Sequence, residues 1–224
     1  MHIGIDFDNT IVCYDQVFYK VAKENGLISP DTPGRMPRGK NNVRDYLRKT
    51  GKEDEWTKLQ GLVYGTKMNH AEVFEGIFDY LYWCRQNKIE VSIISHKTRH
   101  PYIGPKYDLH TAAFDWMEKQ GFFVSDKIGL THDHIFFEKT KADKIKRIAA
   151  RGCTHFIDDL PEFLLEPSFP KNVIRILFNP NDDCEPDFRF HRASSWAEVL
   201  KNQVGDTAHI RVGRSRYAAE KKLK

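Results

Sequence analysis

The sequence predicts an α/β fold with a doubly wound, Rossmann-like parallel sheet. Along most of its 224 residues, short apolar runs rich in β-branched or aromatic residues alternate with segments of helical period. Such alternation is typical of a parallel sheet covered by helices. Because chemistry in these sheets lies at the carboxyl ends of the strands, polar residues there are of special interest. Polar clusters follow three of the apolar runs, namely Asp6 with Asp8, Ser95 with His96, and Asp158 with Asp159.

Five strands are expected in the sheet, each of them a short run dominated by apolar or β-branched residues. Their ranges are 2–7, 91–94, 135–137, 156–157 and 173–178. Short runs without alternation are typical of strands that are buried on both faces. The first strand ends at the pair of aspartates, and the second ends at a serine and a histidine.

Helices are expected where apolar residues recur at every third or fourth position. Their ranges are 17–25, 41–49, 53–64, 71–85, 109–120, 140–151 and 196–204. Several of these segments are followed by a glycine, as at Gly26, Gly51 and Gly121. Glycine is common at helix ends because it readily adopts the left-handed conformation found there.

A helical cap and a basic tail are expected to flank a core domain. The first three helices have no strand among them, so residues 13–70 are expected to form a small cap inserted into a core of residues 1–12 and 71–205. The net charge is +4, but residues 209–224 contain six basic residues and one acidic residue, which leaves about −1 for the rest. The basic excess therefore belongs to a tail, residues 206–224, that is expected to be solvated, with nucleic-acid contact as the less favoured alternative.

The composition excludes several classes of protein. Hydrophobic residues make up 40% of the chain and charged residues 29%, which is ordinary for a globular domain. No apolar run approaches the roughly 18 residues of a membrane-spanning helix, and no basic leader precedes an apolar segment at the N-terminus. The four cysteines are scattered without a Cys-x-x-Cys pair, which favours reduced thiols in a cytoplasmic protein. No apolar stripe beyond the expected core indicates an oligomeric state.

The acidic pair after the first strand has an evident chemical use. Asp6 and Asp8 alternate with Phe7, so on an extended backbone both side chains leave the same side. Two carboxylates placed in this way can hold a hard cation such as Mg²⁺ and leave one oxygen free to attack an electrophile. A turn or capping role is the simpler alternative for such a pair on its own.

The segment I-D-F-D-N-T-I, residues 5–11, resembles the first motif of the haloacid dehalogenase (HAD) superfamily, whose members are mostly phosphatases. In that family an acidic pair is followed by a serine or threonine after the second strand, then by a lysine, and then by an acidic pair after a later strand. The resemblance spans residues 1–180. The matching residues are Asp6 and Asp8, Ser95, Lys141, and Asp158 and Asp159.

The resemblance implies a role for each residue of the acidic motifs. Asp6 would be the nucleophile that forms an aspartyl-phosphate, and Asp8 would be the general acid and then the general base. Asp6 and Asp158 would bind Mg²⁺ with the main-chain carbonyl of Asp8, and Asp159 would bind it directly or through water. The cation is required because a carboxylate must approach a phosphate dianion. Thr10 would stabilise this loop in support of phosphate binding.

The second motif is matched by the segment I-I-S-H-K-T, which contains Ser95 and His96. The serine hydroxyl and the amides that follow it would hold the oxygens of the transferring phosphoryl group. Lys97, Arg99 and His100 could add positive charge there, although each is more typical of a solvated loop.

Three lysines compete for the role of the motif lysine. They are Lys139, Lys141 and Lys144. Thr140 is a good N-cap, which places Lys141 in the first helical turn and close to the end of the preceding strand. Lys144 lies about one turn further along, where helical lysines are usually solvated. Lys141 is therefore expected to balance the carboxylates and to bind the phosphoryl group.

Response regulators are the one rival fold with a similar set of residues. They also combine an N-terminal acidic pair, a serine or threonine and a lysine in an α/β sheet. Their phosphorylated aspartate, however, ends a strand between the acidic pair and the hydroxyl residue, and no strand before Ser95 ends in this way. They also lack the later acidic pair, so this fold is excluded.

The expected function is Mg²⁺-dependent hydrolysis of a phosphomonoester, with a small phosphorylated metabolite such as a sugar phosphate or nucleotide as substrate. Arg35, Arg38 and Lys40 could be presented to an anionic substrate by the cap, although a solvated loop is the simpler alternative. A nucleic-acid end phosphatase, for which the basic tail is the only indication, and a HAD-like binding or regulatory module in a larger assembly stay open as alternatives. No membrane partner is expected.

Overall fold

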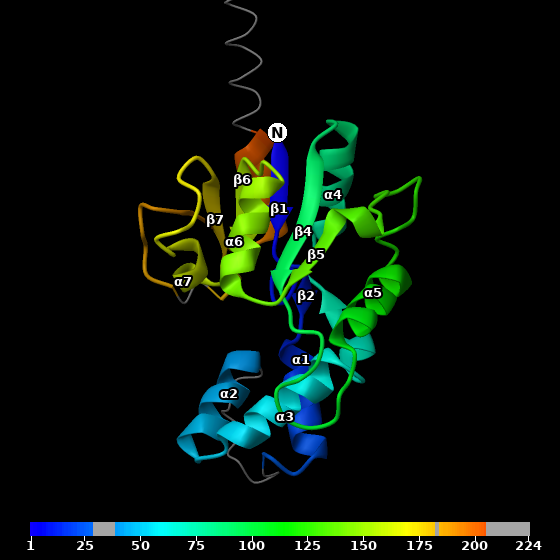
Figure 1. Ribbon diagram of the computed structural model, residues 1–224, viewed down its shortest axis with the longest axis vertical. Helices are drawn as coiled ribbons and strands as arrows, with labels where there is room; N and C mark the ends of the chain where they lie inside the picture. The colour runs from blue at the N-terminus through cyan, green and yellow to red at the C-terminus, as the bar shows by residue number, and fades with distance from the viewer. Residues whose placement is uncertain (29–38, 182–183, 205–224) are drawn as a thin grey trace, which may run out of the picture.

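A six-stranded parallel sheet forms the centre of the computed structural model, which describes residues 1–28, 39–181 and 184–204 (Figure 1). The strand order is β5-β4-β1-β6-β7-β8, and every neighbouring pair is parallel. The strands are β1 (His2–Ile5), β4 (Glu90–His96), β5 (Ile135–Glu138), β6 (His155–Asp158), β7 (Ile174–Phe178) and β8 (His191–Ala193). Because the chain crosses over on both sides of the central β1, the predicted doubly wound α/β fold is confirmed.

The register of the central strands brings the predicted polar clusters to one edge of the sheet. Ile5 of β1 pairs with Ile93 of β4 and with Ile157 of β6. Asp6 and Asp158 are the next residues on two adjacent strands, and the serine of the second cluster lies two positions beyond Ile93. All three clusters therefore lie at the carboxyl ends of neighbouring strands.

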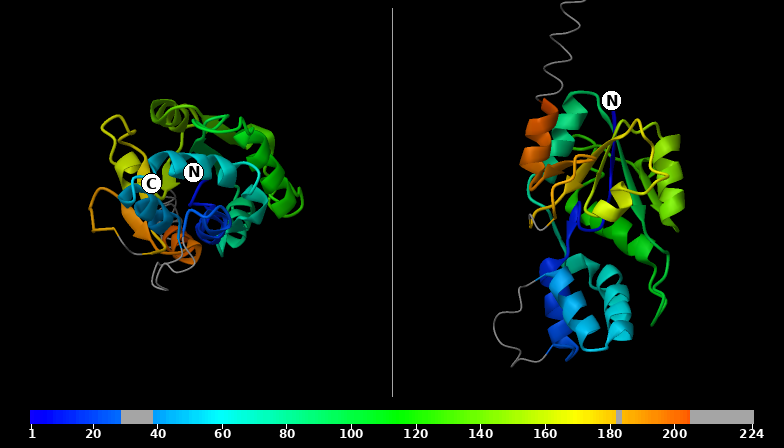
Figure 2. Two further views of the ribbon diagram at one scale, coloured as in Figure 1. Left: turned by 90° about the horizontal axis from the view of Figure 1, so that it is seen from below. Right: turned by 90° about the vertical axis from the view of Figure 1, so that its left-hand side faces the viewer.

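Two hydrophobic clusters bury the two faces of the sheet. The larger one includes residues of α4, α5 and a helix over residues 196–204, and the smaller one includes residues of α6 and α7 (Figure 2). The labelled helices are α4 (Ile77–Gln86), α5 (Leu109–Gln120), α6 (Lys141–Ala150) and α7 (Pro161–Leu164). Burial on both faces explains why the strands are continuous apolar runs rather than alternating ones.

A lobe of three helices lies beyond the carboxyl ends of the central strands (Figure 1). These helices are α1 (Asp15–Glu24), α2 (Lys40–Lys49) and α3 (Glu53–Tyr64). They pack on one another through aromatic contacts such as that between Phe18 and Trp56, whose ring centroids are 5.0 Å apart. The strand β2 (Val12–Cys13) pairs antiparallel with β3 (Glu72–Val73), so the chain enters and leaves this helical lobe through one short ribbon. All three helices lie within the residues expected to form a cap.

The structure differs from the sequence prediction in several elements. The helix expected over residues 71–85 begins only at Ile77, because two residues of that range form β3 and Gly76 has a left-handed φ of 86° before the helix. The short strand β8 and the ribbon of β2 and β3 are not predicted, since two or three residues show no period. The tail of residues 206–224 lies outside the described residues. Within the described chain, no helix combines the length and apolarity needed to cross a membrane.

Candidate active site

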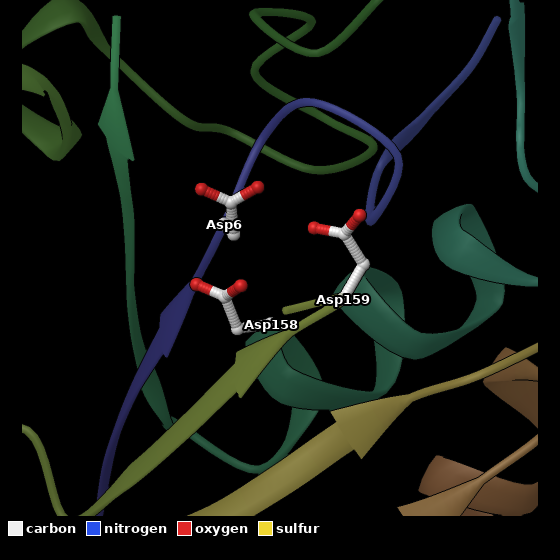
Figure 3. A group of neighbouring side chains, drawn as sticks. All are labelled: Asp6, Asp158 and Asp159. Carbon is white, nitrogen blue, oxygen red and sulfur yellow. The ribbon is translucent and has the colours of Figure 1, made fainter. Parts of the chain in front are cut away.

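Three carboxylates converge at the carboxyl ends of β1 and β6 (Figure 3). Asp6 directly follows β1, Asp158 is the last residue of β6, and Asp159 comes next. One oxygen atom from each of them lies within 4.8 Å of the other two. The structure thus brings three of the residues expected to bind metal into one cluster, and oxygen ligands of this kind are those that Mg²⁺ prefers.

Main-chain hydrogen bonds hold these carboxylates in place. The N–H of Asp6 donates to the carbonyl oxygen of Ile157 at 2.8 Å, which extends the pairing of β1 and β6 by one residue. One carboxylate oxygen of Asp158 accepts the N–H of Leu160 at 2.9 Å, just before α7 begins. The positions of the two acids are therefore determined by the rigid sheet, which favours a precise site.

Lys144 is the lysine that contacts the cluster. Its Nζ donates to Oδ1 of Asp6 and to Oδ2 of Asp158, at 2.6 Å in each case, and its side chain is only 3% exposed. Burial lowers the pKa of Lys144, but the two carboxylates outweigh that effect and hold the pKa above its ordinary value. The expectation that Lys141 balances these acids is wrong, because Lys141 is exposed and makes neither contact.

The geometry of the helix explains why Lys144, and not Lys141, contacts the acids. Thr140 caps α6 as predicted, with its hydroxyl accepting the N–H of Asp143 at 3.0 Å. Side chains on an α-helix lean toward its N-terminus, so a long lysine in the second turn can extend back to the strand ends. Lys144 does so from the buried face of α6, whereas Lys141 is exposed, although both line the cavity. Distance along the helix is therefore a poor guide to distance from the site.

The crowded acids take up protons more readily than isolated ones. Burial raises the pKa of Asp158 to about 7, with Lys144 opposing the shift and Asp6 adding to it. Burial and the charges of Asp158 and Asp6 raise the pKa of Asp159 well above its usual range. One ammonium group therefore does not compensate three carboxylates, and a divalent cation would supply the missing charge. The residues present fit Mg²⁺.

Asp8 is not one of the three clustered carboxylates and has its own partners. Both of its carboxylate oxygens lie 3.0 Å from Nζ of Lys97, and the Tyr14 hydroxyl donates to Oδ1 at 2.6 Å. Burial and the charge of Asp8 raise the pKa of Tyr14, so the phenol keeps the proton that it donates. The chain turns directly after Asp8, where Asn9 adopts a φ of 62° that asparagine tolerates better than most residues. This turn folds the following residues back, so that Tyr14 can reach the Asp8 carboxylate.

Lys97 is not the solvated loop residue that the sequence indicates. Its side chain is 3% exposed, and its Nζ lies 4.8 Å from the ring centroid of Tyr64 in the helical lobe and 5.4 Å from that of Phe7. One feature of the sequence does indicate that Lys97 belongs to the site. It lies two positions after Ser95 and therefore on the same side of an extended chain. The roles of Tyr14 and Tyr64 had no clear signal in the sequence, because Tyr64 is far along the chain and Tyr14 reaches Asp8 only through the turn at Asn9.

A cavity of about 280 Å³ lies over the carboxylates. Asp6, Asp8 and Asp159 line it, together with Lys144. Ser95 also lines the cavity and is 1% exposed, which agrees with its expected place at the end of β4. The expected catalytic acids, the serine and a lysine therefore face one common space.

Two other expected phosphate-binding residues have less direct positions. Thr10 is fully buried, its hydroxyl has no hydrogen-bond partner among the described residues, and it does not line the cavity, so it supports the loop rather than contacting a ligand. His96 lines the cavity, but its ring Nε2 donates to the carbonyl oxygen of Lys139 at 3.0 Å. Lys40 lines the cavity as well, whereas Arg35 and Arg38 lie outside the described residues.

Solved structures with a similar fold come from the HAD superfamily. A HAD-superfamily hydrolase of subfamily IA from Geobacter sulfurreducens is 12% identical, with a TM-score of 0.51 over 89% of this chain and 94% of its own. A HAD hydrolase from Bacillus subtilis, solved with bound magnesium, is 12% identical, with a TM-score of 0.50 over 89% of this chain and 96% of its own. A HAD family hydrolase from Deinococcus radiodurans with bound phosphate and sodium is 14% identical, with a TM-score of 0.50 over 88% of this chain and 92% of its own.

The similarity lies in the fold and not in the overall sequence. No family model and no curated protein matches this chain. At identities of 12–14%, the structural matches show that the chain has a HAD-like α/β fold, as its motifs predict. Any activity must be argued from the site itself.

Proposed function

We propose that this protein is a Mg²⁺-dependent phosphomonoester hydrolase that acts through an aspartyl-phosphate on a small phosphorylated substrate. The main support is the placement of Asp6. Its carboxylate belongs to the cluster of three carboxylates, lines the cavity and contacts Lys144 through one oxygen at 2.6 Å. An acid with these three properties can bind a cation and attack an electrophile.

In this proposal Mg²⁺ would be held by Asp6 and Asp158, by the main-chain carbonyl of Asp8, and by Asp159 directly or through water. When bound, the ion neutralises charge on the phosphoryl group. Magnesium in the Bacillus subtilis hydrolase and phosphate in the Deinococcus radiodurans hydrolase support the choice of ligands.

The chemical steps use the residues that line the cavity. A carboxylate oxygen of Asp6 attacks phosphorus, and the bond from phosphorus to the leaving oxygen breaks. Asp8, which must be protonated in the substrate complex, gives its proton to that oxygen, so the alcohol departs. Asp8 then takes a proton from water, which attacks phosphorus, releases phosphate and restores Asp6. Lys144 and Ser95 hold the phosphoryl oxygens.

The contacts of Asp8 fix its position in the cavity. Lys97 and Tyr14 fix its carboxylate in one orientation at the cavity wall, so little reorganisation is needed when a substrate binds. The polynucleotide alternative rests on the basic tail, which lies outside the described residues, and the structure offers no separate support for a purely binding module.

The variant Asp6→Asn tests the proposal, since it removes the nucleophilic oxygen and keeps the shape of the side chain. We expect Mg²⁺-dependent release of p-nitrophenol from p-nitrophenyl phosphate to fall by at least about 10³-fold. Asp79→Asn is a matched control, because Asp79 is an exposed aspartate on α4 that does not line the cavity. Robust activity in an Asp6→Asn protein with a wild-type circular dichroism spectrum would show that Asp6 is not the nucleophile.

A further inference from the structure

We infer that the helical lobe provides a binding subsite for one negative charge on the leaving group, with Lys40 as its cation. The preferred substrates are then small phosphomonoesters whose leaving group bears a carboxylate. The inference rests on the proposed function, because it assigns a leaving group to the same cavity.

The direction of attack places the leaving group next to the helical lobe. In phosphoryl transfer the attacking and leaving oxygens lie roughly in line with phosphorus. Asp6 attacks from the edge of the sheet, so the leaving group points away from the sheet. The lobe lies in that direction (Figure 1), and its residues Lys40, Gln60 and Tyr64 line the cavity.

Lys40 is held in place at the start of α2. Its N–H donates to Oδ1 of Asp15 at 3.1 Å, and its Nζ lies 5.7 Å from the ring centroid of Tyr64. Burial lowers the pKa of Lys40, but Tyr64, Asp159 and Asp8 outweigh this and raise it above its ordinary value. The side chain is therefore a fixed, half-buried ammonium group that stays charged.

Among the described residues Lys40 has no carboxylate contact, unlike the two buried lysines of the site. Lys97 has both oxygens of Asp8 at 3.0 Å, and Lys144 has two carboxylates at 2.6 Å. In the described part of the chain, no carboxylate lies within 4.0 Å of the Lys40 ammonium. An anionic ligand beside this half-buried ammonium group would add a direct charge-assisted contact that no carboxylate of the described residues makes.

The neighbours of Lys40 can complete a carboxylate site. Burial raises the pKa of Tyr64, so its hydroxyl keeps a proton that it can donate. The amide of Gln60 provides two further donors. One ammonium group matches one negative charge, which favours a carboxylate over a second phosphate dianion.

The size of the cavity agrees with a short leaving group. Its volume of about 280 Å³ is below the range of about 300–1,000 Å³ that is typical of sites for drug-sized ligands. Lys141 also lines the cavity without a carboxylate within 4.0 Å among the described residues. It belongs to α6 of the core, however, so it lies on the phosphoryl side and not on the side of the leaving group.

A pair of non-hydrolysable ligands of similar size tests the inference without any need for turnover. Phosphonoacetate carries a carboxylate, and ethylphosphonate carries a methyl group in its place. We expect calorimetry in Mg²⁺ to show wild-type protein binding phosphonoacetate about 10- to 100-fold more tightly, as a charge-assisted contact predicts. In Lys40→Met the ratio of the two affinities should fall to about one, and Lys40→Arg should restore part of it.

Lys49→Met is the matched control, because Lys49 is an exposed lysine in the last turn of the same helix. It should keep the wild-type ratio. Equal binding of the two ligands by wild-type protein would overturn the inference. An equal loss for both ligands in Lys40→Met would also overturn it, since Lys40 would then contact the phosphoryl group. Hydrolysis of p-nitrophenyl phosphate, which has no carboxylate, tests the proposed function separately.

Discussion

Replacing Lys144 and Lys141 separately by methionine distinguishes their roles most directly. Methionine keeps much of the length and apolar volume of lysine and removes the charge. In the first variant, the buried carboxylates of Asp6 and Asp158 lose an ammonium group that now lies 2.6 Å from each. In the second variant, an exposed ammonium without a carboxylate partner among the described residues is removed.

The two changes should differ greatly in their effect on stability. Removing one partner of a buried ion pair costs about 3–5 kcal/mol, whereas an exposed substitution away from such features stays within about 0.5 kcal/mol. For a chain of this size each kcal/mol moves the melting temperature by about 2–4 °C. Lys144→Met should therefore melt about 6–20 °C below the wild-type protein, and Lys141→Met within about 2 °C of it.

Stability is measured by thermal unfolding, both without metal and in Mg²⁺. Activity is measured separately as phosphate release from p-nitrophenyl phosphate. Mg²⁺ should restore part of the stability of Lys144→Met, because the ion replaces some of the missing positive charge. Activity should fall about 10²- to 10³-fold in Lys144→Met and less than about tenfold in Lys141→Met. A larger loss of stability or activity in Lys141→Met than in Lys144→Met would refute this assignment of the lysines.

Two further predictions concern the metal and the packing of the sheet. Because burial raises the pKa of Asp158 to about 7, Mg²⁺ must displace a proton below that pH. The calorimetric Kd for Mg²⁺ should therefore rise about tenfold for each unit that the pH falls from 7 to 5, and a pH-independent Kd would contradict this. In β1, a Cβ at Gly4 would lie 2.5 Å from the ring of Phe156, so Gly4→Ala should lower the free energy of unfolding in urea by about 1–3 kcal/mol. An unchanged or higher urea midpoint would show that the ring moves away.

The central sheet could be predicted because its signals are local. An apolar run followed by acids, as at Phe156 to Asp159, encodes both a buried strand and a polar strand end within four residues. Parallel strands then place such ends side by side without further information. The positions of Asp6, Ser95 and Asp158 followed from this reasoning.

The residues that were missed depend on contacts between distant parts of the chain. Lys97 is buried because Tyr64 from the helical lobe lies over it, and no pattern near Lys97 encodes that contact. Tyr14 reaches Asp8 only because the chain turns at Asn9. The ribbon of β2 and β3 and the strand β8 have two or three residues each, which is too few for a period to show.

The lysines around the cavity form two groups, those that contact a carboxylate and those that do not. This difference affects which substrates the site should prefer. Lys144 and Lys97 contact carboxylates at 3.0 Å or less, so they orient the acids that perform the proposed chemistry. Lys40 and Lys141 line the same cavity, and neither has a carboxylate within 4.0 Å among the described residues. An unpaired ammonium gains more from an anionic ligand than a paired one does. Since one of these lysines belongs to the helical lobe and the other to the core, a substrate with negative charge at both ends would be favoured over one with charge at a single end.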